Sequence, residues 1–149
     1  AITLGTMDGA NVEIVERVGF ENAEIFGLRV EDVDHFKQEN SYNVWQYYDT
    51  HYEIKRVVDT LTNGTFSADP QDFRIIYNEL MFKNDEFFVL ADFNAYREAQ
   101  ERVARRYQDK QGWARMCLVN IAKSGFFSSD RTIQQYADEI WHINPIDVK

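Results

Sequence analysis

The 149-residue sequence has one cysteine, two prolines and no long hydrophobic run, and each shortage excludes a class of protein. The single cysteine, Cys117, cannot form an internal disulfide, which fits a reducing cytoplasm better than an extracellular location. There is no stretch of 18 apolar residues and no signal-like start, so neither a membrane span nor secretion is predicted. Because the chain has no repeat and no linker rich in proline, glycine or serine, we expect no internal domain boundary.

Basic residues are also few compared with acidic ones, because the chain has 16 lysines and arginines and 25 aspartates and glutamates. The resulting net charge of -9 would repel the phosphate backbone of a nucleic acid and the surface of an anionic membrane, so neither is an expected partner. In contrast, 44% of the residues are hydrophobic and 15% are aromatic, which is enough to build a folded core.

The first part of the chain alternates between strand and helix patterns. An apolar opening strand leads into a turn bounded by Gly5 and Gly9, and Asn11 is placed to cap the short helix that follows. Residues 24–27 have the pattern of a buried strand, and a second short helix is expected over residues 30–36. These patterns indicate a β–α beginning.

From residue 44 onward the periodicity is mainly helical. Residues 69–70, Asp-Pro, are typical of a helix start. Residues 87–91 are the best further strand candidate, and Asp92 or Asn94 can cap the helix after it. The sequence therefore predicts a mainly α-helical chain with a few short strands at its beginning and middle.

Two more helices are expected near the end of the chain. The first covers residues 113–124, is apolar on most sides and ends at Gly125, so we expect it to be buried and to have a left-handed glycine cap. The second is capped within residues 128–130 and carries an apolar face that includes Trp141.

The segment from Gly5 to Gly9 is a candidate anion-binding turn, because the backbone N–H groups at a helix N-terminus attract negative charge. It matches neither the dinucleotide-binding pattern nor the P-loop, and glycine is the default residue where a turn needs unusual dihedral angles. A simple turn is therefore favoured, and Asp8 is interpreted as a turn residue and not as a catalytic acid.

No metal site is predicted, because the three histidines are far apart and none has the spacing of a two-ligand motif. They are His35, His51 and His142. Cys117 has no sequence neighbour of the kind that lowers a thiol pKa, so core packing is favoured over a nucleophilic role.

Two clusters of side chains resemble those used in sugar chemistry. Glu31, Asp32 and Asp34 could divide acid and base roles, but charges at a helix start are usually solvated. Four aromatic residues could stack against sugar rings, although packing in the core is favoured because their burial is strongly stabilising. These residues are Trp45, Tyr47, Tyr48 and Tyr52.

Three arginines stand close together near the end of the helix expected after residue 92. Glu98 precedes Arg102 by four residues, the spacing of a favourable ion pair on a helix. Glu101 precedes Arg105 by the same interval. These arginines and Arg106 therefore need no phosphate ligand to explain them.

Residues 2–13, ITLGTMDGANVE, closely resemble the segment that follows the cofactor lysine in the α-glucan phosphorylases, the family of the glycogen, starch and maltodextrin enzymes. Further matches follow in the same order as in the family, and they include YYD at 47–49, ADF at 91–93 and SGFFSSDRTIQQYADEIW at 124–141. The whole chain is thus similar to the C-terminal piece of such an enzyme.

The resemblance implies an enzyme that cleaves the terminal α-1,4-glucosidic bond of a glucan with inorganic phosphate and releases α-glucose 1-phosphate with retention. It also implies a pyridoxal phosphate cofactor, bound to a lysine as a Schiff base, whose phosphate exchanges protons with the substrate phosphate. A phosphate with a second pKa of about 6 suits this role at neutral pH. The implied intact protein is a cytoplasmic homodimer with an α/β fold, built from two Rossmann-like lobes of the glycosyltransferase B type.

Within that fold, residues 1–149 correspond to the end of the C-terminal, cofactor-bearing lobe, and the rest of the chain is the expected partner. The resemblance places Gly5, Thr6 and Gly9 behind the cofactor as pocket-supporting residues at most, and it implies no catalytic residue or metal ligand in this segment. The last helix, through its Trp141 face, is expected to reach back towards the N-terminal lobe.

The family's cofactor lysine, in a G-N-M-K-like context, precedes the position equivalent to Ala1. None of the chain's own lysines stands in that context; they are Lys37, Lys55, Lys83, Lys110, Lys123 and Lys149. The strand-like start without methionine is also expected of a chain cut within a fold. The 149 residues alone are therefore predicted to be inactive and to carry no covalently bound cofactor.

Two alternatives are left open by the sequence. The chain could be an autonomous helical interaction module that only shares ancestry with the phosphorylases. It could also be the lobe of a sugar-nucleotide transferase, a group with similar architecture but without pyridoxal phosphate.

Overall fold

The computed structural model describes residues 1–144 and residue 146, and it begins with a β–α–β unit. The two strands pair in parallel, with Thr3 opposite Ala23 and Gly5 opposite Ile25. The elements of this unit are β1 (Thr3–Gly5), α1 (Ala10–Val18), the 3-10 helix η1 (Phe20–Asn22) and β2 (Ala23–Ile25). The β–α beginning expected from the sequence is confirmed. Lys149 lies outside the described residues.

The described chain after β2 consists of helices and the turns between them. The helices are α2 (Val30–Glu39), α3 (Val44–Thr50), α4 (Tyr52–Asp59), α5 (Arg74–Met81), α6 (Val89–Gln108), α7 (Lys110–Ser124), the 3-10 helix η2 (Gly125–Phe127), α8 (Ser129–Tyr136) and the π-helix η3 (Ala137–Trp141). The mainly helical character predicted from the sequence is therefore confirmed.

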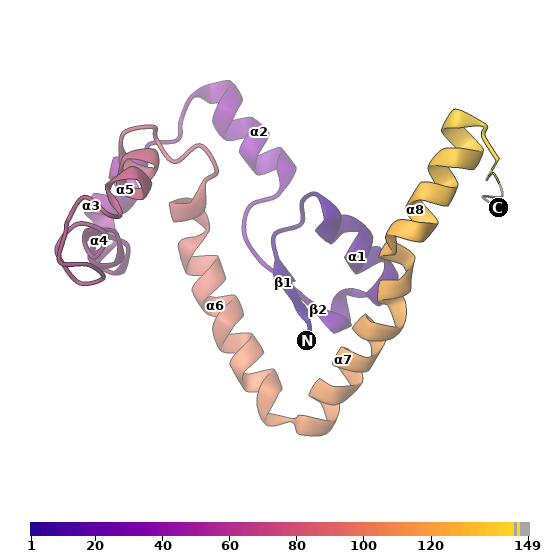
Figure 1. The fold of residues 1–149 in the computed structure, drawn as a ribbon. Helices are drawn as coiled ribbons and strands as arrows, with labels where there is room; N and C mark the ends of the chain where they lie inside the picture. The colour runs from indigo at the N-terminus through magenta and orange to yellow at the C-terminus, as the bar shows by residue number, and fades with distance from the viewer. Residues whose placement is uncertain (145, 147–149) are drawn as a thin grey trace.

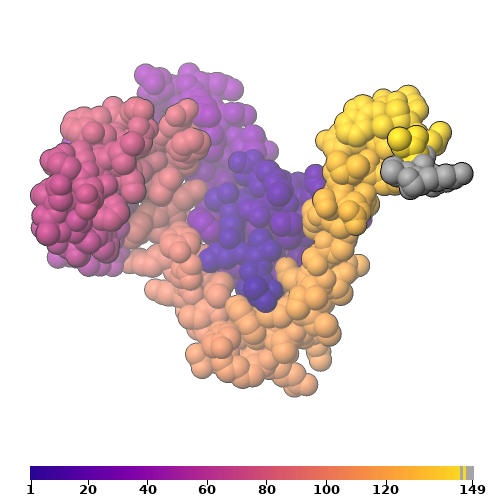
Figure 2. All heavy atoms as spheres, viewed as in Figure 1, coloured from indigo at the N-terminus to yellow at the C-terminus, as the bar shows by residue number. Residues whose placement is uncertain are grey.

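Helices α6 and α7 form the two arms of a V, and the β–α–β unit lies between them (Figure 1). Strand β2 contacts α6, while α1 and η1 contact α7. In α7 the Asn120 Nδ2 donates a hydrogen bond of 2.7 Å to the backbone oxygen of Asn22, which is 98 residues earlier. Helices α3 to α5 gather at the start of α6, and α8 projects away from the body of the molecule (Figure 2).

Apolar side chains are buried in two separate clusters. The smaller one lies between α1 and β2 and contains Val15, Val18 and Ala23, with Val119 of α7 packed against it. The larger one joins α3, α4, α5 and the start of α6, and it contains Tyr42, Val44, Ile54, Val58, Met81, Phe88 and Leu90. The V thus has one core between its arms and another at the start of α6.

The expectation that all four aromatic residues of the 45–52 segment pack in the core is only half right. Tyr47 and Tyr48 pack against the larger cluster. Trp45 and Tyr52 instead have exposed fractions of 38% and 77%. Trp45 makes edge contacts with the rings of Tyr48 and Phe82, so it belongs to the surface of this bundle.

The strand predicted at residues 87–91 is wrong, because helix α6 already begins at Val89. The buried carboxylate of Asp85 accepts hydrogen bonds from the N–H groups of Val89 and Leu90, at 3.0 and 2.7 Å. It satisfies two N–H groups that a helix start leaves free, so the helix is capped from upstream. Asp92 and Asn94 therefore lie inside α6 and are not its caps.

Three other helix ends differ from the expectation. Asp69 accepts a bond from the N–H of Gln71 in a local turn, and α5 begins only at Arg74. Gly9, and not Asn11, stands at the N-cap of α1. Gly125 has a right-handed φ of -57°, so α7 runs on into η2 without a left-handed cap. The predicted cap of the last helix is confirmed, because the Ser128 side chain accepts the N–H of Arg131.

Helix α7 is not buried as expected, since none of its residues is in either cluster of buried side chains. The chain exposes 10653 Å², although a compact protein of this length would expose about 7,900 Å². Large exposed apolar residues lie along α7, α8 and η3, and they are Leu118, Ile121, Ile133, Tyr136, Ile140 and Trp141. A surface of this kind is typical of one that another part of a protein covers. Within the described residues, no helix is long and apolar enough to cross a membrane.

Candidate functional site

The carboxyl edge of the parallel strands carries the residues that the sequence singled out at positions 5 to 9. In parallel sheets, ligands bind at this edge, where loops from neighbouring strands meet. A cavity of about 280 Å³ lies there. Its lining comes from the β1–α1 turn, the β2–α2 turn, α2 and the start of α6, and comprises Thr6, Asp8, Leu28, Arg29, Val30, Val33, Asp34, Lys37, Phe87, Phe88 and Asp92.

Gly5, Thr6 and Asn11 form one side of the β1–α1 turn. The Asn11 Nδ2 donates a hydrogen bond of 2.9 Å to the backbone oxygen of Thr6. A Cβ atom on Gly5 would lie 2.4 Å from that nitrogen, so a side chain at position 5 would displace Asn11. Thr6 lines the cavity, whereas Gly5 acts only by leaving room for the bond that shapes the turn.

Gly9 supplies the backbone conformation with which α1 begins. Its φ of +53° is in the region that favours glycine. Its N–H donates a bond of 2.7 Å to the Asp8 carboxylate, so Asp8 is a turn residue, as expected. Of the three residues predicted to support a pocket, only Thr6 lines the cavity, and Gly5 and Gly9 determine the path of the turn.

The β2–α2 turn is tied to α6 by a contact that sequence reasoning missed. Asp92 Oδ1 accepts a hydrogen bond of 2.7 Å from the N–H of Leu28. Gly27 has a φ of +80°, and a Cβ atom there would lie 2.6 Å from the Asp92 carboxylate. Burial raises the pKa of Asp92 above its ordinary value of 3.8, although the bond from Leu28 acts in the opposite direction.

Replacing Asp92 with asparagine is expected to change how stability depends on pH. Because the folded state holds the Asp92 proton more tightly than the unfolded state, ionising this group above its ordinary pKa of 3.8 favours unfolding. The amide oxygen of Asp92→Asn still accepts the Leu28 N–H. The variant should therefore gain stability relative to the wild type as pH rises from about 4 to 7, measured by urea unfolding.

The control for this measurement is Asp49→Asn, which changes an exposed carboxylate on α3. This variant removes the same charge as Asp92→Asn from a position in solvent, so it reports the effect of net charge alone. A constant difference between Asp92→Asn and the wild type across this pH range would contradict the assignment.

The charge of the cavity is unfavourable for a phosphate group. Three carboxylates, on Asp8, Asp34 and Asp92, face two cations, on Arg29 and Lys37. A phosphate dianion would meet net repulsion from this set of side chains. The described residues alone therefore do not fit the phosphate of a cofactor, and no chemical step is assigned to them.

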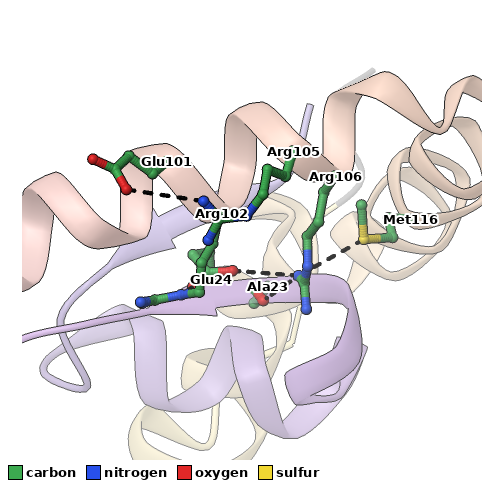
Figure 3. Close-up of polar contacts among 7 residues, drawn as sticks. All are labelled: Ala23, Glu24, Glu101, Arg102, Arg105, Arg106 and Met116. Carbon is green, nitrogen blue, oxygen red and sulfur yellow. Dashed lines mark hydrogen bonds and ion pairs between the residues drawn. The ribbon is translucent and has the colours of Figure 1, made fainter.

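A buried ion pair holds β2 against α6 beside this edge (Figure 3). Glu24 has an exposed fraction of 6%, and its Oε1 lies 2.5 Å from Arg102 Nε. Its Oε2 lies 3.5 Å from Arg106 Nη1, which also donates a hydrogen bond of 3.2 Å to the Ala23 oxygen. The predicted pairing of Arg102 with Glu98 is therefore wrong.

Of the predicted pairs on α6, the pairing of Arg105 with Glu101 is confirmed at 3.9 Å. Arg106 also contacts the Met116 sulfur at 3.9 Å, so this cluster reaches α7. The sequence feature that could have predicted this cluster is Glu24, because an acid inside an otherwise apolar strand pattern needs a cationic partner.

The other candidate residues are not brought together into a site. Glu31 and Asp32 are exposed in the first turn of α2, and Asp32 accepts the N–H of Arg29 at 2.8 Å, in agreement with a solvated helix start. Cys117 is only partly buried. Among the described residues, no three His, Cys, Asp or Glu side chains are arranged to hold a metal ion.

Comparison with known proteins decides the family. The model of the carbohydrate phosphorylase family matches residues 1–143. This chain belongs to the carbohydrate phosphorylase family. The resemblance read from residues 2–13 and 124–141 is therefore confirmed.

The curated relatives include glycogen phosphorylases from a bacterium and from mammals. The chain is 44% identical over 146 residues to the enzyme of Bacillus subtilis, covering 98% of this chain and 18% of the relative. It is 51% identical over 146 residues to the muscle form of Bos taurus, covering 97% and 17%. It is 47% identical over 150 residues to the brain form of Mus musculus, covering 100% and 18%. This phosphorylase chain thus spans less than a fifth of the length of these relatives.

Proposed function

We propose that this chain forms the end of the C-terminal, cofactor-bearing lobe of an α-glucan phosphorylase. The whole polypeptide would use inorganic phosphate to cleave terminal α-1,4-glucosidic bonds and release α-glucose 1-phosphate with retention. The observation that carries this proposal is the family match over residues 1–143. The names of the relatives, which are glycogen phosphorylases, support glucan as the substrate.

In this proposal the chain's own residues act as support. Gly5, Thr6 and Gly9 shape the turn after β1, and the bond from Leu28 to Asp92 fixes the turn after β2. Both turns lie at the carboxyl edge of the strands, where an α/β lobe binds its ligands. Their role is to hold the wall of a pocket in position.

Pyridoxal phosphate is the proposed cofactor of the whole enzyme, where it would supply a phosphate able to give and take a proton at neutral pH. The residues that hold this phosphate are proposed to lie in the remainder of the polypeptide. The excess of carboxylates in the edge cavity supports this division.

The rest of the polypeptide is also the proposed cover for the apolar face of α7, α8 and η3. The chain exposes about 2,700 Å² more than a compact protein of its length, well above the roughly 800 Å² that each partner buries in an ordinary interface. This excess disfavours the alternative of an autonomous helical module. The complete enzyme is proposed to be a cytoplasmic homodimer.

Two preparations test the proposal, the complete polypeptide and the 149-residue chain alone. With soluble glucan and phosphate, the complete polypeptide should form α-glucose 1-phosphate, and the chain alone should form none. After incubation with pyridoxal phosphate and reduction with borohydride, mass spectrometry should show one stoichiometric adduct on the complete polypeptide and none at a single site of the chain.

Each outcome bears on a different part of the proposal. A complete polypeptide that forms no α-glucose 1-phosphate would overturn the assigned reaction. One stoichiometric adduct on a single lysine of the isolated chain, for example Lys37, would overturn the claim that the cofactor lysine lies elsewhere.

A further inference from the structure

A second cavity, of about 370 Å³, lies between α2 and α3. It shares no lining residue with the cavity at the carboxyl edge. Its lining comes from the end of α2, the α2–α3 turn and α3 with the residue after it, and comprises Phe36, Ser41, Tyr42, Gln46, Tyr47, Thr50 and His51. The volume is in the range of small-molecule sites, which is about 300–1,000 Å³.

The lining combines aromatic rings with polar groups and contains no carboxylate, lysine or arginine. Three rings, from Phe36, Tyr42 and Tyr47, supply apolar surface. Hydroxyl, amide and imidazole groups supply hydrogen-bond donors and acceptors. Such a lining suits an uncharged ligand with both apolar faces and hydroxyl groups.

Several of these polar groups are free to bind a ligand. Within the described part of the chain, the side chains of Ser41, Gln46 and Tyr47 make no hydrogen bond. Burial, and then the negative charge of Asp92, raise the pKa of the Tyr47 phenol, so it stays protonated and can donate. The Tyr42 hydroxyl is instead bonded to Asp85 at 2.7 Å, which leaves only its ring for the cavity.

The rings do not form a slot for a flat ligand. The rings of Tyr47 and His51 are nearly parallel at 16°, but their centroids are 6.0 Å apart, which leaves no room for another ring between them. The planes of Phe36 and Tyr42 meet at 62°, with centroids 5.7 Å apart. Those of Tyr42 and Tyr47 meet at 43°, with centroids 5.3 Å apart. A planar heteroaromatic ring would need two parallel walls, whereas a puckered sugar ring can place its C–H groups on inclined rings.

The cavity also differs from the surface that the rest of the polypeptide is proposed to cover. The apolar face of α7, α8 and η3 carries leucine, isoleucine and tryptophan side chains. Around the cavity, in contrast, Ser41, Gln46 and Thr50 are exposed and polar. A polar, uncharged rim is compatible with a surface that remains in water.

We propose that this cavity binds a glucosyl unit of an α-glucan at a point separate from the bond that is cleaved. The inference rests on the proposed function, which makes a polymeric glucan the substrate. A second contact with the same polymer would raise the effective concentration of chain ends near the reaction site. The cavity would therefore matter for polymers and not for short oligosaccharides.

The test uses the complete polypeptide with amylopectin as the polymer and maltopentaose as the short substrate. The variant Gln46→Ala/Tyr47→Phe removes a free amide and a free hydroxyl and keeps the tyrosine ring. We expect about fivefold weaker retention in gels that contain amylopectin, the loss of two modest hydrogen bonds. For maltopentaose phosphorolysis, kcat and KM should not change.

The matched control is Gln38→Ala/Tyr48→Phe. Gln38 is exposed on α2, and the Tyr48 hydroxyl bonds to Asp59, so neither side chain lines the cavity. This control should be retained like the wild type. Gln46→Ala alone, at an exposed helical position, should show a smaller loss of retention in the same direction. This single variant keeps the test valid if the double variant does not fold.

Unchanged retention of both Gln46 variants would overturn the glucan site. A fall in maltopentaose turnover equal to the fall in amylopectin binding would also overturn it, since the cavity would then act in the reaction itself. Failure of the proposed function is seen separately, as a wild-type protein that does not phosphorolyse maltopentaose. Retention in amylopectin gels does not depend on that assay.

Discussion

Replacing Asp85 with alanine is expected to lower the free energy of unfolding by about 4 kcal/mol, because two buried donors and one partly buried donor would lose their acceptor. The Asp85 side chain is 2% exposed and bonds to the Tyr42 hydroxyl and to the N–H groups of Val89 and Leu90. Burial and the bond to Asp85 raise the pKa of Tyr42, so its hydroxyl stays a donor across the physiological range. In Asp85→Ala the Tyr42 hydroxyl and the Leu90 N–H would be buried without partners.

Urea unfolding followed by the helical circular dichroism signal measures this loss. Tyr42→Phe removes one of the three donors and should reduce the free energy of unfolding by only about 1 kcal/mol. Glu86→Ala, at the exposed neighbouring position, should change it by less than about 0.5 kcal/mol. An Asp85→Ala variant no less stable than Tyr42→Phe would show that the carboxylate does not cap α6.

Replacing Glu24 with alanine is expected to lower the free energy of unfolding by about 3 kcal/mol, because it breaks a buried ion pair. The Glu24 side chain is 7% exposed, whereas those of Arg102 and Arg106 are 41% and 37% exposed. Water can therefore solvate the two arginines in part once Glu24 is gone. For this reason the expected loss is at the lower end for buried pairs.

A double-mutant cycle separates the ion pair from the packing of the glutamate side chain. Glu24→Ala and Arg102→Ala should be strongly non-additive, with a coupling energy of more than about 1 kcal/mol. The control is Glu101→Ala with Arg105→Ala, an exposed pair on one helix whose coupling should be below about 0.5 kcal/mol. Equal coupling in the two cycles would contradict the assignment of Glu24 as the anchor of α6.

Local patterns predicted the β–α beginning well, because everything they need lies close in the sequence. The turn from Gly5 to Gly9 depends on the bond that the Asp8 carboxylate accepts and the bond that the Asn11 amide donates, and its backbone requires glycine. The strand prediction at residues 87–91 was wrong because the residue that decides the structure lies outside the apolar run. A short apolar run fits a strand and a helix equally well, and the decisive cap, Asp85, lies before the run.

Contacts between distant segments could not be read from spacing. The bond from Leu28 to Asp92 joins residues 64 apart, and the pairing of Glu24 with Arg102 joins residues 78 apart. The i, i+4 rule correctly paired Arg105 with Glu101 but not Arg102 with Glu98, because a buried acid competes better for an arginine than an exposed one. The site at the strand edge was therefore predicted only as far as its local turn.

The apolar pattern of α7 was read correctly, but its burial does not follow from the pattern alone. Leu118 and Ile121 are each 65% exposed in this chain. Periodicity identifies which residues avoid water, but it does not identify the segment that covers them. We propose that this segment belongs to the rest of the polypeptide. The same argument applies to Ile140 and Trp141 at the end of the chain.

The hydrogen bond from Asn120 to Asn22 has a consequence for how the chain is made. Ribosomes add about 5–20 residues per second, so the 98 residues between these partners take roughly 5–20 s to synthesise. During that interval α7 is not yet available to the β–α–β unit, and Glu24 has no arginine partner until α6 has been synthesised. The β–α–β unit is therefore synthesised before the helices that it contacts, and the nascent unit is open to chaperones for that time.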